Sequence, residues 1–309
     1  NDFIAQTDTS SATTREWDFE YTANIIHSRA LTTRNTLRIG GYYNRWVAPK
    51  GKRFYTGRRC DLETFSGAIV DEHRIGKLTL DGGVQVMRTY IHDYGGFNIN
   101  GSASGFGKVE SVTNEWEAPV VNASMGAAYH FRPAISFHGN AACGMVEPRR
   151  GTLDGSRKEP DNERRLKLDA GVRFEFPGFG SAVITGFMVG QDDAIVLSGK
   201  TAVVNGHVLE LYENRDQRQT GIELECSSPL IRNAVRFFAT GAVMRSRAEQ
   251  NGVMRTNREA PQAIASGGAY YTRGGFDLNA LWKYVSEYES VRFAEPGKGP
   301  QPLGDFHDV

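Results

Sequence analysis

The sequence predicts an all-β fold, an antiparallel up-and-down β-barrel whose long strands cross a membrane. Several segments alternate apolar and polar residues with period two, the pattern of strands that have one apolar and one polar face. In Arg164–Phe176 every second residue from Leu166 onward is apolar, and four of the residues between them are charged. Arg15–Ile26 repeats the pattern, with aromatic and aliphatic residues on one parity.

The predicted strands are also unusually long. Each runs for about a dozen residues, roughly twice the usual strand length. A tilted strand needs about that length to cross a bilayer. A transmembrane helix is excluded, because no stretch of the chain approaches about 18 uninterrupted apolar residues.

Turns and loops alternate regularly along the chain. Glycine and proline mark most of the six predicted tight turns: Arg29–Arg34, Glu72–Gly76, His130–Pro133, Pro177–Gly180, Ser227–Pro229 and Thr272–Gly275. Longer polar segments lie between these turns: Ala48–Arg59, His92–Glu117, Glu147–Glu163, Ser198–Gly206, Arg247–Pro261 and Glu295–Pro302. The result is about twelve long strands, with short turns at one end and long loops at the other, as in outer-membrane barrels.

Further strands and the aromatic residues agree with this interpretation. Lys77–Met87 and Phe276–Tyr284 show the same alternation. Aromatic residues collect near predicted strand ends, where interfacial girdles would place them: Trp17, Tyr42, Tyr43, Trp46, Tyr90, Trp116, Tyr129, Phe131, Tyr270, Tyr271 and Tyr288. A β-propeller, whose period is similar, would need shorter strands and more turns. A long β-sandwich or a soluble β-solenoid remains an alternative.

Composition and motifs exclude several classes of function. The formal net charge is zero, so bulk electrostatics favours no nucleic-acid partner. Cys60, Cys143 and Cys226 form no CxxC pair, and small buried or wall-facing residues are the simplest interpretation. No catalytic signature is present, and Gly101–Gly105 has alanine where a nucleophile would stand. We therefore expect no enzyme, no cofactor and no metal site.

The most ligand-like residues lie in the predicted long loops. The segment from Lys50 to Arg59 carries five cations and two aromatic residues. Guanidinium groups there could hold carboxylate or catecholate oxygens while an aromatic ring stacks on the ligand. The candidate ligand-binding residues are Arg53, Tyr55, Arg58, Arg59, His92, Tyr94, Arg149 and Arg150. Lipopolysaccharide phosphates would attract the same cations.

Several segments resemble the β-barrel of TonB-dependent outer-membrane receptors. They follow one another in the order and spacing of that family: SFHGNAACGMVEP at Ser136–Pro148, ERRLKLDAGVRFEF at Glu163–Phe176, AVITGFMVGQDDAIV at Ala182–Val196, YENRDQRQTGIELE at Tyr212–Glu225, YVSEYESVRF at Tyr284–Phe293 and PLGDF at Pro302–Phe306. Together they span most of Leu78 to Val309.

The resemblance implies a partial receptor barrel over residues 1–309, without a plug domain, in a bacterial outer membrane. It also implies TonB-coupled uptake of a scarce small ligand such as a ferric siderophore, with lipopolysaccharide around the barrel and the TonB complex acting through the missing plug. The alternatives are a plug-free pore or adhesin barrel and a soluble all-β binding module.

Overall fold

The computed structural model describes residues 18–48, 59–94, 112–148, 154–156, 158–204, 207–250, 252–290, 301–304 and 306–308. In these ranges the chain is built of 17 strands, and 12 of them have 10 to 25 residues. The long strands are β1 (Phe19–Thr32), β2 (Asn35–Ala48), β3 (Cys60–Ile75), β4 (Leu78–Tyr94), β6 (Val120–Arg132), β7 (Ile135–Val146), β8 (Glu163–Phe176), β9 (Gly180–Val204), β10 (His207–Ser227), β11 (Val235–Gln250), β13 (Ala263–Arg273) and β14 (Phe276–Val285). The short strands are β5 (Val112–Trp116), β12 (Val253–Thr256), β15 (Tyr288–Ser290), β16 (Gln301–Leu303) and β17 (Phe306–Asp308). Within the described ranges, no helix has the length and apolarity needed to span a membrane.

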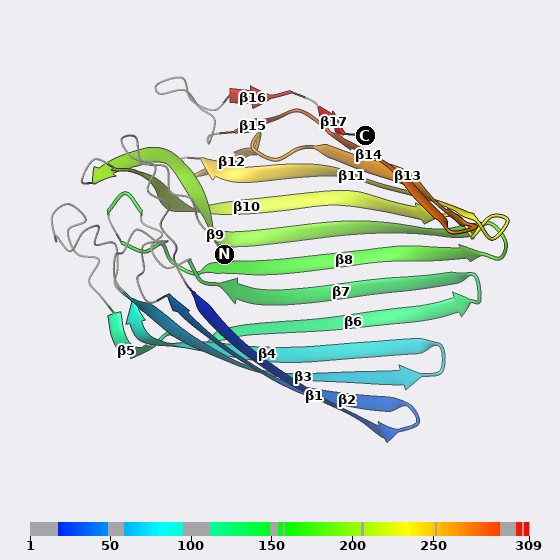
Figure 1. Cartoon of the computed structure of the whole chain (residues 1–309), viewed down its shortest axis with the longest axis horizontal. Helices are drawn as coiled ribbons and strands as arrows, with labels where there is room; N and C mark the ends of the chain where they lie inside the picture. The colour runs from blue at the N-terminus through cyan, green and yellow to red at the C-terminus, as the bar shows by residue number, and fades with distance from the viewer. Residues whose placement is uncertain are drawn as a thin grey trace.

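Fifteen of these strands form one antiparallel sheet in chain order. The order is β1-β2-β3-β4-β6-β7-β8-β9-β10-β11-β13-β14-β17, with β5 paired to β4 and β12 to β11. The sheet is strongly curved, with the short connections at one end and the long ones at the other (Figure 1). Over the described residues the sheet is not closed, because β1 forms one edge and β14 with the short β17 forms the other. The single meandering sheet confirms the predicted up-and-down barrel architecture and excludes a propeller or a sandwich.

Some predicted boundaries were wrong by several residues. β1, β3 and β13 continue to Thr32, Ile75 and Arg273, so their turns are tighter than expected. The connection after β10 is longer than predicted and ends at Ala234. The predicted loop Ser198–Gly206 is instead mostly strand, because β9 and β10 extend past their neighbours as a long hairpin.

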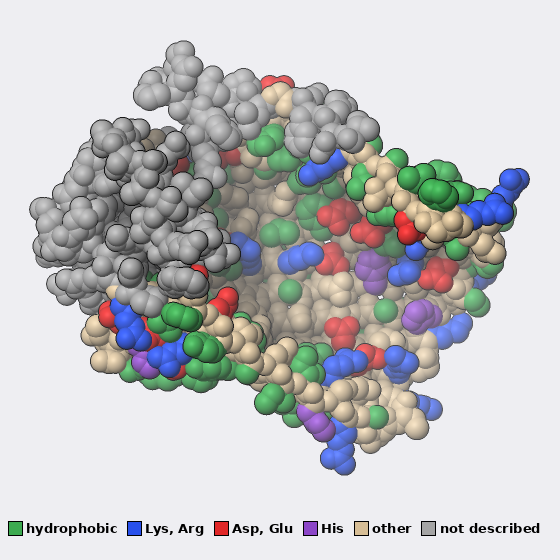
Figure 2. All heavy atoms as spheres, viewed as in Figure 1, with side chains coloured by type: hydrophobic (Ala, Val, Ile, Leu, Met, Phe, Trp, Pro, Cys, Tyr) green, Lys and Arg blue, Asp and Glu red, His purple; other side chains and the backbone are tan. Residues whose placement is uncertain are grey.

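The register divides the side chains between two faces of the sheet. Directly opposed residues share a face, so Asp81, Gly126, Asn140 and Asp169 lie on one face, in a row across β4, β6, β7 and β8. Leu80, Ala127, Gly139 and Ala170 form the adjacent row on the other face. Figure 2 shows that the concave side of the sheet carries acidic, basic and histidine side chains. We call this side the inner face and the convex side the outer face.

The apolar part of the outer face has the height of a bilayer core. On β8 it runs from Leu166 to Phe176, which is about 33 Å of strand at about 3.3 Å per residue. A tilt of about 45° reduces this to about 23 Å along the membrane normal, close to the ~25 Å apolar band of outer-membrane barrels. Its side chains are large and exposed, for example Ile69, Ile222 and Val243 at 56%, 60% and 68%. Burial against lipid accounts for side chains of this kind on a convex surface.

Aromatic residues border this band at both ends, although not all of the predicted ones do. Tyr43, Tyr90 and Trp116 lie on the outer face towards the loops, and Tyr129 and Tyr271 lie there towards the turns. Tyr42, Trp46 and Tyr270 were assigned wrongly to the girdle, because the register turns them to the inner face. Trp17 lies outside the described residues.

The connection between β8 and β9 depends on a glycine that touches the neighbouring turn. Gly180 has a φ of 119°, and a Cβ atom there would lie 2.0 Å from the carbonyl oxygen of Ser227 at the end of β10. Gly178 in the same turn has a φ of 81° but nothing within 4 Å of a Cβ. Substituting each glycine by alanine therefore separates two contributions to the unfolding free energy. Gly178 reports the strain of a left-handed backbone alone, and Gly180 reports that strain together with a steric collision.

We expect Gly180→Ala to destabilise the barrel more than Gly178→Ala. Both variants carry the left-handed strain of about 1 kcal/mol, and the collision with Ser227 should add about 2 kcal/mol to Gly180→Ala. Urea unfolding of each variant from detergent micelles measures the difference. Equal unfolding free energies for the two variants would show that the contact with Ser227 is unimportant.

Candidate functional site

The inner face forms a polar groove across the middle of the sheet. One part of it, with a volume of about 500 Å³, is lined by residues of β7 to β11, including His138, Asp169, Gln219 and Glu223. His138 Nε2 lies 3.3 Å from Thr185 Oγ1 on β9. The polar side chains of the groove can form hydrogen bonds with water or with a polar solute on the concave side. The outer face at the same level is apolar.

A row of oxygen-bearing side chains crosses this groove. Asn140 Nδ2 donates to Asp169 Oδ1 at 2.6 Å, and Lys167 Nζ lies 3.7 Å from Asp169 Oδ2. Gly126 separates Asn140 from Asp81, and a Cβ on it would lie 2.5 Å from Asp81 Oδ1 and 2.8 Å from Asn140 Oδ1. The missing side chain of Gly126 therefore lets the row continue without interruption from β4 to β8.

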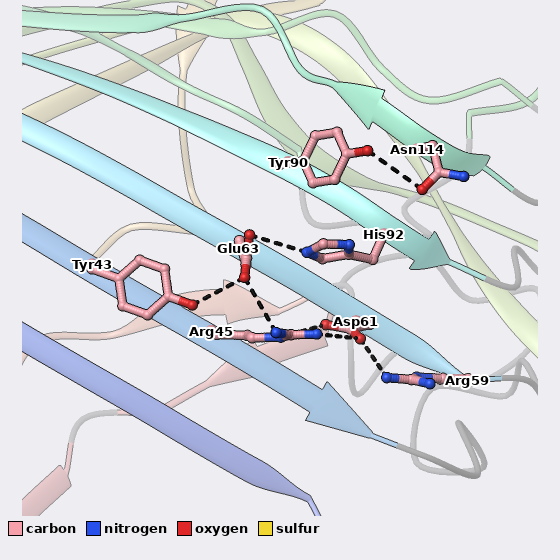
Figure 3. A network of polar contacts seen from close by, with 8 residues as sticks. All are labelled: Tyr43, Arg45, Arg59, Asp61, Glu63, Tyr90, His92 and Asn114. Carbon is pink, nitrogen blue, oxygen red and sulfur yellow. Dashed lines mark hydrogen bonds and ion pairs between the residues drawn. The ribbon is translucent and has the colours of Figure 1, made fainter.

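A second polar group lies at the loop end of β2, β3 and β4 (Figure 3). Arg45 donates two hydrogen bonds of 3.0 Å to Asp61, and Arg59 donates a third of 2.6 Å to the same carboxylate. Glu63 accepts a hydrogen bond of 3.0 Å from the Tyr43 hydroxyl. His92 Nε2 lies 3.0 Å from the other oxygen of Glu63, an ion pair when the imidazole is protonated, although the angle is poor for a hydrogen bond. We call these six residues the mouth network.

The mouth network lies on the outer face, where the apolar band has ended. Tyr43, Phe65, Tyr90 and Trp116 form an aromatic cluster with ring centroids 4.9 to 5.8 Å apart, and the carboxylates of β3 follow it towards the loops. On the inner face at the same height, Ala48, Cys60 and Ile91 are buried beside Trp46 and Leu62. The polarity of the two faces is thus reversed beyond the aromatic cluster. Strands with a polar outer side cannot face hydrocarbon there, so this end of β2 to β4 lies above the apolar band.

Among the predicted ligand-binding residues that the structure describes, two come together. Arg59 and His92 both belong to the mouth network, where each lies beside a carboxylate. Tyr94 ends β4, and Arg53, Tyr55, Arg58, Arg149 and Arg150 lie outside the described residues. Sequence reasoning missed Arg45, Asp61 and Glu63. Their alternation beside aromatic residues at predicted strand ends was the available signal.

The structure gathers no metal ligands in the described ranges, where no group of three or more His, Cys, Asp or Glu is placed to hold an ion. Asp154 is used locally, because its carboxylate accepts hydrogen bonds from the amides of Ser156 and Lys158 at 2.8 and 2.9 Å. No disulfide joins Cys60, Cys143 and Cys226; Cys60 is buried, and Cys143 and Cys226 lie on the outer face.

The loop end of β10 forms a junction with two neighbouring segments. Asn214 donates to the carbonyl oxygens of Asp161 and Asp193 at 2.9 and 2.7 Å, and its own Oδ1 accepts from the amide of Asp161 at 2.8 Å. Beyond it, Glu259 lies near Glu213, Glu289 and Arg215. Burial raises the pKa of Glu259, Arg215 opposes that shift, and the two neighbouring carboxylates add to it. Glu259, in the connection between β12 and β13, is therefore a group whose protonation favours the folded segment.

The chain is similar to solved structures of outer-membrane transport proteins. The FrpB iron transporter from Neisseria meningitidis (F3-3 variant) matches with a TM-score of 0.62 and 14% identity, over 94% of this chain and 47% of FrpB. The copper transporter OprC matches with a TM-score of 0.66 and 14% identity, over 94% and 47% of the two chains. The siderophore receptor PirA from Acinetobacter baumannii matches with a TM-score of 0.58 and 13% identity, over 94% and 55%.

These structures are TonB-dependent receptors, and the chain shares the fold of their β-barrels. They are transport receptors rather than enzymes. The chain spans about half the length of each of them. No protein-family model and no curated protein matches the sequence.

We expect Arg45→Gln to weaken the loop end of β2 to β4 more than Arg59→Gln. Arg45 binds Asp61 with two nitrogens and also lies 3.4 Å from Glu63, whereas Arg59 supplies a single hydrogen bond from a more exposed side chain. Asp61 is 2% exposed, so its carboxylate cannot replace the lost donors with bulk water. Hydrogen exchange of the backbone around Asp61 measures the effect. Faster exchange in Arg59→Gln than in Arg45→Gln would contradict this account.

The segment around Glu259 should be more stable in acid than at neutral pH. Because the folded pKa of Glu259 is raised, the folded state takes up a proton more readily than the unfolded segment does. That contribution is complete below the unfolded pKa of about 4.5 and is lost as the pH rises through the folded value. The protection factors of the amides at 257–263, which compare each exchange rate with its intrinsic rate at the same pH, should therefore be larger at pH 4 than at pH 8. Glu259→Gln should remove this pH dependence, and an unchanged dependence in that variant would show that another group titrates.

Proposed function

We propose that this chain is the barrel portion of a TonB-dependent receptor that takes up a scarce ligand, such as a ferric siderophore, across a bacterial outer membrane. The observation that carries the proposal is the combination of one meandering sheet, an apolar outer face of bilayer height and a polar inner face. The iron and copper transporters and siderophore receptors with the same fold support it.

Residues 1–309 are proposed to form part of a barrel rather than a closed barrel. Edge strands in hydrocarbon need partners for their backbone amides and carbonyls. β1 and β14 form the two edges of the sheet, and three residues of β17 cover part of β14. We propose that these edges are paired in the membrane and that a plug domain, supplied outside residues 1–309, connects the barrel to the TonB complex.

Ligand capture is proposed at the loop end of the sheet. Arg53, Tyr55, Arg58, Arg59, His92, Tyr94, Arg149 and Arg150 are the proposed contacts, because cations and aromatic rings suit an anionic catecholate or carboxylate ligand. Arg59 and His92 already lie beside Asp61 and Glu63.

Uptake assays on the full-length native protein test the proposed function. Iron-starved cells that express it should accumulate a radiolabelled ferric siderophore, drawn from a catecholate and hydroxamate panel, only when TonB is present. Arg53→Gln with Arg58→Gln should lower ligand affinity by about tenfold, the effect of losing about 1.4 kcal/mol of binding free energy. Arg173→Gln, on the inner face near the turns, is the matched control and should leave affinity unchanged.

Other outcomes would contradict the proposal. Steady single-channel conductance in planar bilayers, without TonB dependence, would indicate a plug-free pore. A protein that remains in buffer without detergent and melts cooperatively would indicate a soluble binding module.

A further inference from the structure

Four arginines gather on the outer face, at the loop end of β8, β10 and β11. Arg218 on β10 lies directly opposite Arg247 on β11, and Arg245 occupies the same face two residues away. Arg164 on β8 lies opposite Asp192 on β9, which pairs in turn with Arg218 at 2.6 Å. Arg164, Arg218, Arg245 and Arg247 are all exposed. We call them the outer arginine cluster.

The surrounding protein neutralises two of the four arginines in the cluster. Asp192 compensates Arg218, and Asp193 compensates Arg164 at 3.2 Å. In the part of the chain that the structure describes, Arg245 and Arg247 have no ion-pair partner, although Glu249 follows on the same strand face. Like charges placed directly across a strand pair are destabilising. The opposition of Arg218 and Arg247 therefore carries an unfavourable interaction, which Asp192 reduces and an anion bound beside Arg247 would reduce further.

The surface immediately below the cluster is apolar. Ile222 and Leu224 on β10 and Val243 on β11 are exposed on the outer face, between the arginines and the turn end. Arg218 lies over Gly190, since a Cβ at that glycine would be 3.3 Å from the Arg218 Nη1 atom. The Arg218 guanidinium thus lies close to the sheet, and the cluster lies at the loop-side border of the apolar band, where headgroups of the outer leaflet meet acyl chains. Nucleic acid or a soluble acidic protein could pair with the arginines but would not bury the adjoining apolar surface.

We infer that the outer arginine cluster binds the phosphate groups of a phosphorylated lipid in the outer leaflet. Guanidinium groups bind phosphate oxygens in pairs, and the fork of Arg247 beside Arg245 and Arg218 offers several donors to one phosphate. The acyl chains of the same lipid lie along Ile222 and Val243. This inference rests on the proposed function, because it requires the convex face of the sheet to face an outer membrane.

Lipid binding to the purified full chain tests the inference. The protein is transferred to nanodiscs of phosphatidylcholine that contain lipid A with both phosphates or dephosphorylated lipid A, and bound lipid is counted by native mass spectrometry. Wild type should retain the phosphorylated lipid in preference to the dephosphorylated one. Arg245→Gln with Arg247→Gln should weaken this retention by about tenfold or more, as expected for the loss of at least ~1.4 kcal/mol. Raised salt should weaken it in wild type.

Two further variants show whether charge and position matter. Arg245→Lys with Arg247→Lys keeps the charge but loses the planar fork, so retention should be intermediate. Arg165→Gln with Arg173→Gln removes two inner-face arginines of β8 and should retain lipid as wild type does. Equal loss in this control, equal retention of dephosphorylated lipid, or displacement by millimolar inorganic phosphate would overturn the inference. Retained lipid binding in a protein that takes up no siderophore would support the lipid site and contradict only the receptor assignment.

Discussion

The need to pair every backbone amide and carbonyl in hydrocarbon is the constraint on which the rest of this structure depends. A sheet meets it by pairing each strand with its neighbours along its length. From β1 to β14 that pairing is continuous, with register shifts only at a few bulges. Once the register is set, the period of two decides which face each side chain takes. The inner row of Asp81, Asn140 and Asp169 and the outer row beside it are two results of one ladder of hydrogen bonds.

At the loop end of β2 to β4 the side chains still alternate between the two faces, but both faces lie outside the apolar band. Beyond the aromatic cluster, charged residues take the outer parity and apolar residues take the inner one. The strands need not stop where the membrane stops, since a sheet in water also keeps its hydrogen bonds. Above the apolar band, the inner parity packs and the outer parity is hydrated, as in the buried group of Cys60 and Ile91. The full lengths of β2 to β4 therefore exceed the length needed to cross the membrane.

Sequence patterns predicted the strands and turns, which depend on the period of two and on turn residues. They failed to predict which face some side chains take, because that depends on the register between strands. The apolar parity of Leu166 to Phe176 could be read directly, because one strand shows both of its faces. The inward positions of Tyr42, Trp46 and Tyr270 could not, because an aromatic residue near a strand end fits either face until its partner is known. Ser198–Gly206 was predicted to be a loop, yet β9 continues past Gly199, whose φ is 71°, because its pairing with β10 resumes at Thr201 after a register shift. The opposition of Arg218 and Arg247 also exists only through register, since 28 intervening residues separate them in the sequence.

The order of strands in the sheet has a consequence for how the protein is assembled. Each long strand pairs with the long strands that precede and follow it in the chain. Hairpins can therefore form one after another as the polypeptide emerges, without waiting for a distant partner. A nick in a surface loop would divide the polypeptide but leave both pieces held by an intact seam of hydrogen bonds. Continuity of the covalent chain matters less to this architecture than continuity of the seam.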